Sequence, residues 1–429
     1  MAAAENVAVP AARIMSNSSV PGEVGYPNGH LGYLTDHEKA AFQSFKALLE
    51  EKGFYNPGPP ASHDDPLLLR YLRARRWVPE DAFTQFSETE RWREANDIDV
   101  LYHTIDLDAY EESRRLYPQW TGRRDRRGIP LYVFEIQHLD NKTVSAYEKK
   151  GAQSTFSEAK TDGKTAPGLL RLFALYENLT RFQMPFCTQL TDREFPDVPI
   201  TMSTNIVDIS NVGLKQFWNL KSHMQAASQL ATAHYPETLD RIFVIGAPVF
   251  FNTVWGWIKR WFDPITVSKI FILSPHEVKP TLETFIDVRN IPKKYGGELD
   301  YTWGDLGVTD PAWDGVVEWE NGYTGFPSGP MIWEDDGDRV VCIALGAKDG
   351  KPRRERVCTV PRAWPPTATA VTTEGTQTDD ATESAVYKTT SRDDATQTDL
   401  TGEAMEKLTI NDEKTAAVPP ISTSATTAA

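Results

Sequence analysis

The sequence DDPLLLRYLRARRW at residues 64–77 begins with an aspartate–proline step and continues with leucines and a tyrosine separated by arginines. A helix tolerates proline in its first turn, because the missing amide hydrogen would have no partner there anyway. Asp65 and Pro66 therefore predict the start of a helix that runs through Leu72, with basic residues at its end.

The flanking sequences predict two more helices. Thr35 and Glu38 match a capping box, in which each side chain pairs with a free backbone amide, and apolar residues follow at helical spacing. Pro79 suits the first turn of another helix, which is expected to reach about Ala95. We therefore expect residues 34–103 to form a helical unit.

The pattern changes to alternating strands and helices over residues 104–304. The predicted strands are 131–136, 200–208, 241–246 and 269–273, and the predicted helices are 168–182, 214–232, 249–261 and 281–288. Such alternation predicts an α/β domain with a mixed, mostly parallel sheet and crossover helices.

The remaining regions have different compositions. Residues 1–33 show no apolar period, and residues 366–429 hold 4 basic and 11 acidic residues in a threonine- and alanine-rich sequence. Both are expected to be disordered, because they have too little apolar surface to offset their ordering entropy. Residues 305–365 are rich in tryptophan and glycine, and their one strand-like run, 339–345, is expected to add an edge hairpin.

Composition excludes several classes of protein. The chain carries 45 basic and 60 acidic side chains, a net charge of −15, which argues against a nucleic-acid partner. Cys187, Cys342 and Cys358 form neither a disulfide framework nor paired zinc-ligand spacing, so we expect reduced thiols in a reducing compartment. The N-terminus lacks the apolar run of a signal peptide, and the longest uncharged stretch, 242–258, is too short to span a bilayer.

Catalytic motifs are also absent from the sequence. It contains no GxSxG, GxGxxG, GxxxxGK[ST] or HExxH pattern, and the eight histidines are dispersed. We therefore expect no enzyme activity, catalytic residue, metal site or cofactor. An esterase that uses an apolar pocket remains a third alternative, which a chromogenic ester screen would test.

Six segments, in this order and spacing, resemble the Sec14-like (CRAL-TRIO) lipid-binding family. They are 64–77, Tyr117-Pro118-Gln119 followed by 125–128, Ile206-Val207-Asp208, Tyr235-Pro236-Glu237, 263–271 and 291–297. The resemblance covers residues 35–300. It implies an N-terminal helical unit packed on an α/β domain whose sheet forms the floor of an apolar pocket for one phospholipid.

Such a ligand sets physical requirements. A phospholipid with about 30 methylene groups would lose over ~20 kcal/mol on leaving a bilayer for water, at about 0.8 kcal/mol for each group. Only a dry pocket offsets that loss, and only membrane contact gives a feasible route for exchange. The protein therefore needs an apolar cavity, a headgroup site and a gate.

The gate candidate is the segment 249–262, where the family carries a mobile lid helix. Tryptophan and phenylalanine beside Lys259 and Arg260 suit a helix that lies in a membrane interface, while a buried core helix is the alternative. The residues expected to form the gate and contact the membrane are Phe250, Phe251, Val254, Trp255, Trp257, Ile258, Trp261 and Phe262.

The resemblance also implies a site for a phosphatidylinositol headgroup. The matching positions are Arg75, Arg76, Glu237, Thr266 and Lys269. Basic side chains neutralise a phosphate, while threonine donates a hydroxyl and glutamate accepts from inositol hydroxyls. Arg76 replaces the family's usual lysine, which keeps the charge but changes the geometry. Taken alone, Arg75 and Arg76 would suit a solvated helix face.

The family's phosphatidylcholine set is matched only in part. Tyr132 and Ser203 are retained, but Thr121 stands where a tyrosine is usual and Asn205 where a threonine is usual. Loss of an aromatic ring weakens cation–π binding of choline, so another lipid, a sterol or another hydrophobe is expected at this second headgroup site. Tyr176 either lines the cavity or packs in the core.

A run of four arginines is open to two interpretations. Arg123, Arg124, Arg126 and Arg127 suggest a solvated turn before a strand, or else a patch attracted to anionic lipid.

The tail repeats one short motif, as Thr376-Gln377-Thr378 and Thr396-Gln397-Thr398. It resembles the ligand of the dimeric dynein light chain, which captures peptides by strand addition, and two copies on one tail suit a bivalent partner. Chance in a threonine-rich segment is the alternative.

The leading hypothesis is a cytoplasmic monomer that binds phosphatidylinositol and exchanges or presents it between membranes, touching Golgi or endosomal membranes transiently. The alternative is a lipid-sensing scaffold that holds another hydrophobic ligand and recruits partners through its tail. Deletion of the tail separates the two, because only the scaffold would lose its role.

Overall fold

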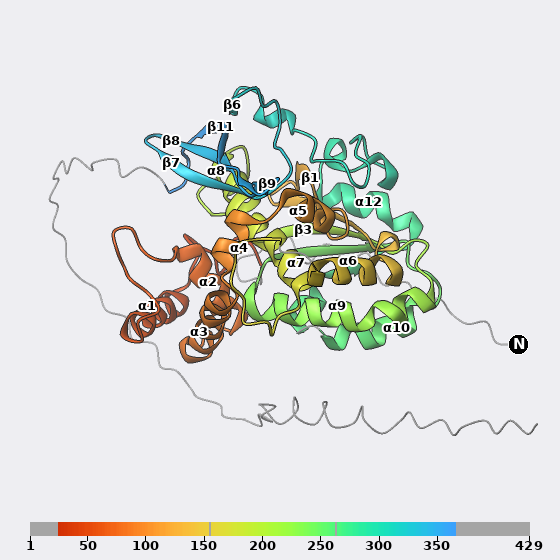
Figure 1. Ribbon diagram of the computed structural model, residues 1–429, viewed down its shortest axis with the longest axis horizontal. Coiled ribbons are helices and arrows are strands. Elements are labelled where there is room, and N and C mark those ends of the chain that lie inside the picture. The colour runs from red at the N-terminus through yellow and green to blue at the C-terminus, as the bar shows by residue number, and fades with distance from the viewer. Residues whose placement is uncertain (1–24, 154–155, 262–263, 366–429) are drawn as a thin grey trace, which may run out of the picture. The chain divides into compact units, whose positions relative to one another are not determined.

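The computed structural model describes residues 25–153, 156–261 and 264–365. Its first part is helical (Figure 1). The helices are α1 (Asp36–Glu51), α2 (Asp65–Ala74), α3 (Pro79–Ala95), α4 (Ile98–Thr104) and α5 (Leu107–Arg114). The first three confirm the predicted helices.

Local signals explain where these helices begin. The Thr35 amide donates to Glu38 Oε2 at 2.8 Å and the Glu38 amide donates to Thr35 Oγ1 at 3.3 Å, so the predicted capping box is formed. Asp64 caps α2 by accepting from the Leu67 amide at 2.8 Å. The apolar sides of α1, α2 and α3 share one core, which includes Phe45, Leu68 and Phe86 among its buried members.

A five-stranded sheet forms the centre of the α/β domain, in the order β1-β2-β3-β4-β5. Its strands are β1 (Gln119–Arg124), β2 (Pro130–Glu135), β3 (Ser203–Asp208), β4 (Leu239–Ile245) and β5 (Ile270–Ile272). β1 and β2 are antiparallel, while β2 to β5 are parallel. The predicted mixed, mostly parallel sheet is confirmed.

Helices cover both faces of this sheet (Figure 1). α12 (Pro275–Phe285) packs on the face that carries Leu131, Ile206 and Phe243. The opposite face meets α6 (Asn141–Gln153), α7 (Pro167–Asn178), α9 (Leu214–His234) and α10 (Phe251–Ile258). Shorter elements are η3 (Ile136–His138), the π-helix η4 (Leu179–Gln183), α8 (Met184–Gln189), η5 (Lys259–Trp261), α11 (Pro264–Ser268), η6 (Val288–Asn290), η7 (Lys293–Tyr295) and η8 (Pro311–Trp313).

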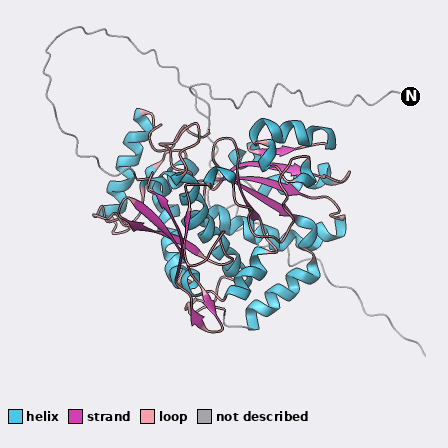
Figure 2. Ribbon diagram, turned by 90° about the horizontal axis from the view of Figure 1, so that it is seen from above, coloured by secondary structure: helices cyan, strands magenta, loops and turns pink. Residues whose placement is uncertain are grey.

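The C-terminal region differs from the expected edge hairpin. It forms a second, four-stranded antiparallel sheet in the order β6-β11-β8-β7, separate from the first (Figure 2). Its strands are β6 (Glu318–Trp319), β7 (Met331–Asp336), β8 (Arg339–Ala344) and β11 (Glu355–Pro361), and β9 (Ala347–Lys348) pairs with β10 (Lys351–Pro352). The sheet packs on Phe182 and Phe186, aromatic residues of η4 and α8.

The expectation of disorder over 1–33 is wrong for residues 25–33. These residues form turns, and Tyr26 and His30 are buried. The reason is a set of long-range hydrogen bonds: Arg193 Nη1 donates to the Tyr26 hydroxyl at 2.9 Å, and Arg73 Nη1 donates to the Gly29 carbonyl at 3.0 Å. Residues 1–24 and the tail 366–429 lie outside the described residues.

The predicted solvated turn is correct for only part of the arginine run: Arg126 and Arg127 lie in a turn before β2, whereas the first two arginines are buried. Arg123 and Arg124 lie in β1 and are buried, and Arg124 Nη1 pairs with Asp192 at 2.8 Å. Burial opposes the charge of Arg127, but the carboxylates of Asp125 and Asp240 raise its pKa above the usual range. Within this run, Arg126 is the exposed member, and it donates to the Glu283 carbonyl.

Within residues 25–153, 156–261 and 264–365, no helix is both long enough and apolar enough to span a bilayer.

Candidate functional site

The predicted gate helix lies against the sheet. Phe251 and Val254 of α10 are buried and share a cluster with Val244 of β4, Ile209 and Val212. Phe250 and Trp255 pack against the same cluster but remain partly exposed. α10 therefore covers this face of the sheet. Phe262 lies outside the described residues, as do the side chains of Ile258 and Trp261.

α9 covers the neighbouring part of the same face loosely. Its Leu220 is buried, but Phe217, Met224 and Ala227 are only partly buried although they pack on the domain core. Apolar side chains that remain partly accessible on two neighbouring helices suit an apolar ligand, because they lose contact with water when it binds.

Three of the five predicted headgroup residues meet at the edge of the sheet. Lys269 Nζ lies 3.0 Å from Glu237 Oε2 and donates to the Leu239 carbonyl at 3.0 Å. The Lys269 amide donates to the Thr266 carbonyl at 3.1 Å. Glu237 adopts a left-handed backbone conformation, with φ of 55°, at the turn that leads into β4. These residues thus form one cluster of opposite charges.

Arg75 and Arg76 are not part of this cluster. Both are exposed at the end of α2, and no ion pair joins either to another residue of the described ranges. Arg76 has a left-handed φ of 52°. Their role in headgroup binding stays a prediction.

Two residues that sequence reasoning missed lie within electrostatic range of the Lys269–Glu237 pair. Burial lowers the pKa of Arg73 to about 10, although the charge of Glu237 opposes this shift. Burial also holds the pKa of His30 well below its usual value, and the nearby charges of Arg73 and Lys269 add to the effect. Arg73 belongs to the arginine-rich sequence 64–77, so its position beside Arg75 and Arg76 could have suggested it. His30 could not be suggested, because residues 1–33 were expected to be disordered.

These two side chains offer unpaired atoms. His30 Nδ1 lies 3.0 Å from the Asn28 carbonyl, which only accepts, so Nδ1 carries the proton of the neutral ring and Nε2 is an acceptor. His30 Nε2 and Arg73 Nε are buried and have no hydrogen-bond partner among the described residues. The cluster therefore combines two cations, one carboxylate, one free donor and one free acceptor.

The predicted second headgroup residues divide into two groups. Tyr132 and Asn205 are opposite each other on β2 and β3, and Asn205 Nδ2 donates to Ser203 Oγ at 3.0 Å. The Ser203 hydroxyl donates to the Thr238 carbonyl at 3.1 Å. Thr121 is fully buried, and its hydroxyl donates to the Leu131 carbonyl at 3.0 Å. The structure brings the first three together and uses Thr121 to join β1 to β2.

Comparison with known proteins identifies the family. Residues 114–297 match the CRAL/TRIO domain, and residues 39–88 match the CRAL/TRIO N-terminal domain. The "Sec14 cytosolic factor" of Schizosaccharomyces pombe is 30% identical over 278 residues, which cover 65% of this chain and 88% of that protein. The chain belongs to the Sec14-like (CRAL-TRIO) family.

Other relatives of this Sec14-like chain have similar identity. The "SEC14 cytosolic factor" of Eremothecium gossypii is 28% identical over 65% of this chain and 82% of that protein. A "phosphatidylinositol/phosphatidylcholine transfer protein" of Arabidopsis thaliana is 29% identical over 56% of this chain and 40% of that protein. The second sheet lies beyond residue 297, where the family match ends.

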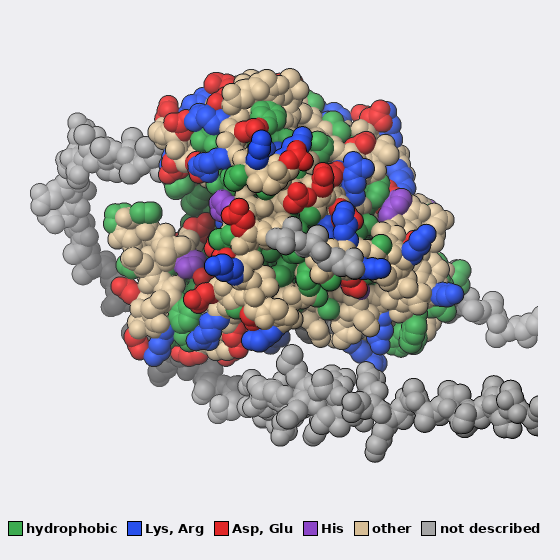
Figure 3. Space-filling model, viewed as in Figure 1, with side chains coloured by type: hydrophobic (Ala, Val, Ile, Leu, Met, Phe, Trp, Pro, Cys, Tyr) green, Lys and Arg blue, Asp and Glu red, His purple; other side chains and the backbone are tan. Residues whose placement is uncertain are grey.

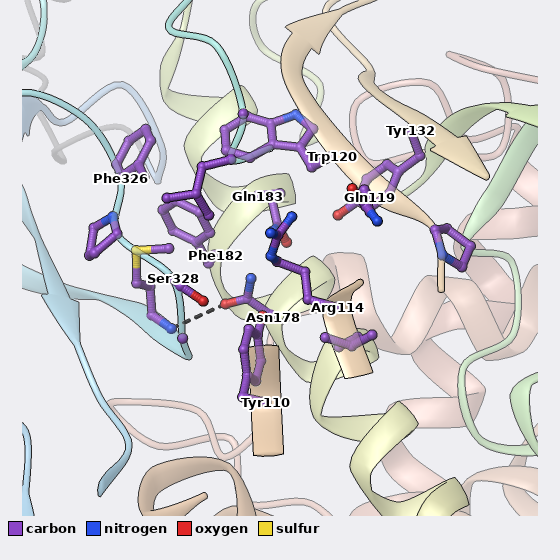
Figure 4. Close-up of a pocket in the computed structure, with 17 residues that line it drawn as sticks. Tyr110, Arg114, Gln119, Trp120, Tyr132, Asn178, Phe182, Gln183, Phe326 and Ser328 are labelled. Carbon is purple, nitrogen blue, oxygen red and sulfur yellow. Dashed lines mark hydrogen bonds between the residues drawn. The ribbon is translucent and has the colours of Figure 1, made fainter. Parts of the chain in front are cut away.

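A small cavity lies between the Sec14-like domain and the region that carries the second sheet (Figure 4). Tyr132 lines it together with Gln119, Gln183 and Arg114. Its volume of about 60 Å³ suits a few water molecules rather than a lipid headgroup. Gln119 Nε2 and Gln183 Oε1 are buried there without a partner among the described residues, which fits such water.

Tyr176 belongs to an aromatic cluster of the Sec14-like core. Its ring centroid lies 5.4 Å from that of Phe173 and 5.1 Å from that of Tyr235, and burial raises its pKa to about 12. Core packing thus describes its surroundings.

Beside this cluster, Glu177 pairs with Arg93 Nη1 at 2.7 Å and with Arg181 Nε at 2.7 Å. This ion-pair network joins α3 of the helical unit to α7.

Proposed function

We propose that this Sec14-like protein binds one phospholipid, with phosphatidylinositol preferred, and exchanges or presents it between membranes without covalent chemistry. The observation that carries the proposal is the cluster around Lys269 and Glu237. It offers positive charge for a phosphate, and Arg73 Nε, His30 Nε2 and Glu237 for inositol hydroxyls. The partly exposed apolar side chains of α9 and α10 offer apolar surface for acyl chains.

The relatives support the same function. Two are named cytosolic factors and one is named for the transfer of phosphatidylinositol and phosphatidylcholine. We further propose that it acts in the cytoplasm as a monomer without a cofactor and touches Golgi or endosomal membranes transiently. The alternative, a lipid-sensing scaffold, predicts a different ligand and a tail that is essential.

Mass spectrometry of lipid that co-purifies with the full chain tests the ligand. We expect phosphatidylinositol in the extract, because its headgroup matches the hydrogen-bonding groups of the Lys269–Glu237 cluster. If another hydrophobe is found, and no phosphatidylinositol is taken up even from vesicles that contain it, the ligand assignment is wrong although the fold remains.

The tail motifs support a further partner. We propose that Thr376-Gln377-Thr378 and Thr396-Gln397-Thr398, which lie outside the described residues, bind the two grooves of a dimeric dynein light chain. Calorimetric titration of the full chain is expected to show binding that is lost when Gln377 and Gln397 are both replaced by alanine. The absence of heat at two temperatures with the unchanged chain would reject the partner.

A further inference from the structure

Two segments of the chain lack acidic residues altogether. Residues 209–236 and 241–262 contain no aspartate or glutamate, although the average of 60 acidic residues in 429 would place about seven in these fifty positions. Besides the buried Arg241, they carry four basic residues, Lys215, Lys221, Lys259 and Arg260. In a protein with a net charge of −15, these segments form a local region of positive charge.

The same segments expose large apolar side chains. Seven such side chains are exposed in the described ranges, and four of them, Leu214, Trp218, Val249 and Trp257, belong to these segments. Trp218 is 56% exposed and Trp257 is 43% exposed. Hydrophobic and basic side chains lie side by side over the α9 and α10 end of the molecule (Figure 3).

The two helices hold these side chains in one surface. Leu214, Trp218 and Lys221 lie on one side of α9, because residues three and four apart are neighbours on a helix. The rings of Trp218 and Trp257 meet edge to face with centroids 5.7 Å apart, which joins α9 to α10. Lys221 Nζ lies 5.5 Å from the centroid of the Trp218 ring. We call Lys215, Trp218, Lys221 and Trp257 the tryptophan–lysine face.

One acidic side chain of another helix contacts α9. Glu148 of α6 lies 3.0 Å from His223 Nδ1, on the side of α9 that faces α6. His223 also pairs with the Tyr117 hydroxyl at 2.7 Å, so this contact belongs to the packing of α9 on the domain. The tryptophan–lysine face itself carries no carboxylate, since residues 209–236 and 241–262 have none.

We propose that the tryptophan–lysine face docks on an anionic lipid surface, with α9 as a fixed anchor beside the gate helix. Tryptophan favours the boundary between water and acyl chains, and lysine is attracted to anionic headgroups. Each basic residue near such a surface strengthens binding about fivefold, and salt weakens this attraction. This inference rests on the proposed function, since a lipid carrier must contact a membrane. It goes further by assigning that contact to α9 as well as to the gate helix, and by specifying that the membrane lipid is anionic.

Flotation of the full chain with vesicles tests this assignment. Vesicles of phosphatidylcholine alone are compared with vesicles that also contain phosphatidylserine, at low and high salt. We expect binding to the anionic vesicles only, and at least a tenfold loss in the variant Lys215→Glu/Lys221→Glu. Trp218→Ser is expected to lower binding at both salt concentrations, because it removes apolar contact rather than charge.

Lys348→Glu/Lys351→Glu is the matched control. It changes the charge by the same amount at exposed positions of β9 and β10, which form a separate two-stranded sheet outside α9 and α10. Circular dichroism confirms that each variant is folded. An equal loss of binding in the two charge-reversal variants, or binding that does not depend on lipid charge, would overturn the docking assignment.

Bound lipid separates this proposal from the proposed function. Lys215→Glu/Lys221→Glu is expected to co-purify with phosphatidylinositol as the unchanged chain does, because neither lysine belongs to the Lys269–Glu237 cluster and slow docking still allows loading over the hours of expression. If the protein never carries phosphatidylinositol but still binds anionic vesicles through Trp218, docking is correct and the ligand assignment is wrong. If the protein carries phosphatidylinositol, but Lys215→Glu/Lys221→Glu and Trp218→Ser bind vesicles as the unchanged chain does, the ligand assignment is correct and the docking assignment is wrong.

Discussion

Lys269→Ala is expected to lower the rate of phosphatidylinositol transfer between vesicles about tenfold to a hundredfold. Lys269 Nζ holds Glu237 at 3.0 Å in a half-buried site, and its loss removes the positive charge that would face the lipid phosphate. A hydrogen bond to a charged group contributes about 1.5–3 kcal/mol, which corresponds to this range of affinity. Transfer of labelled phosphatidylinositol, measured beside transfer of a lipid without inositol, checks the effect.

Lys293→Ala is the matched control for this variant. Lys293 also forms an ion pair, with Asp300 at 3.2 Å, but both side chains are mostly exposed. Exposed pairs contribute at most about 1 kcal/mol, so transfer is expected to remain normal. Unchanged transfer in both Lys269→Ala and Glu237→Ala would show that the cluster does not bind the headgroup.

Glu177→Ala is expected to lower the free energy of unfolding by about 3–5 kcal/mol, the usual loss when one partner of a buried ion pair is removed. The Glu177 side chain is almost fully buried and pairs with Arg93 of α3 and with Arg181. Its removal leaves two arginines without their carboxylate and loosens the helical unit from the α/β domain. Urea unfolding of the full chain measures the loss.

The same network makes stability depend on pH. Burial alone would raise the pKa of Glu177, but Arg93 and Arg181 overcome burial and lower the pKa from 4.5 to about 2. The unfolded chain therefore binds a proton more readily, so the stabilisation is complete above about pH 5 and is lost as the pH falls towards 2. A difference of this size corresponds to about 3 kcal/mol. Glu177→Gln should flatten this part of the profile.

Glu334→Ala provides the comparison for Glu177. Glu334 pairs with Arg354 at 2.6 Å on the surface, where the two side chains are 37% and 57% exposed. Its removal is expected to change stability by less than about 1 kcal/mol and to leave the acid limb of the profile unchanged. Similar losses in the two alanine variants would contradict the importance assigned to the buried network.

Local signals explain which parts of the fold could be predicted. α1, α2 and α3 begin at a capping threonine, an aspartate–proline step and a proline, so a few neighbouring residues define each start. The parallel strands β2, β4 and β5 are mainly apolar runs, because both of their faces are covered, whereas β3 is apolar only at Ile206 and Val207.

The parts that were missed depend on distant residues. β1 contains Arg123 and Arg124, whose burial is possible only because Asp192 and Asp310 lie nearby in the fold. The turns at 25–33 require Arg193 in the same way. In the candidate site, resemblance pointed to Glu237, Thr266 and Lys269, but the buried His30 depends on those turns and could not be placed without them.

The second sheet changes where the Sec14-like domain ends as a physical unit. Trp333 Nε1 donates to the Phe182 carbonyl in the π-helix at 3.0 Å, and the Tyr102 hydroxyl of α4 donates to the Met331 carbonyl at 2.7 Å. A truncated protein ending near residue 304 would expose Phe182 and Phe186 to solvent. The resulting aromatic surface would promote aggregation with other copies. Recombinant fragments, and any exchange of domains during evolution, would therefore have to keep residues 305–365 attached to the lipid-binding core.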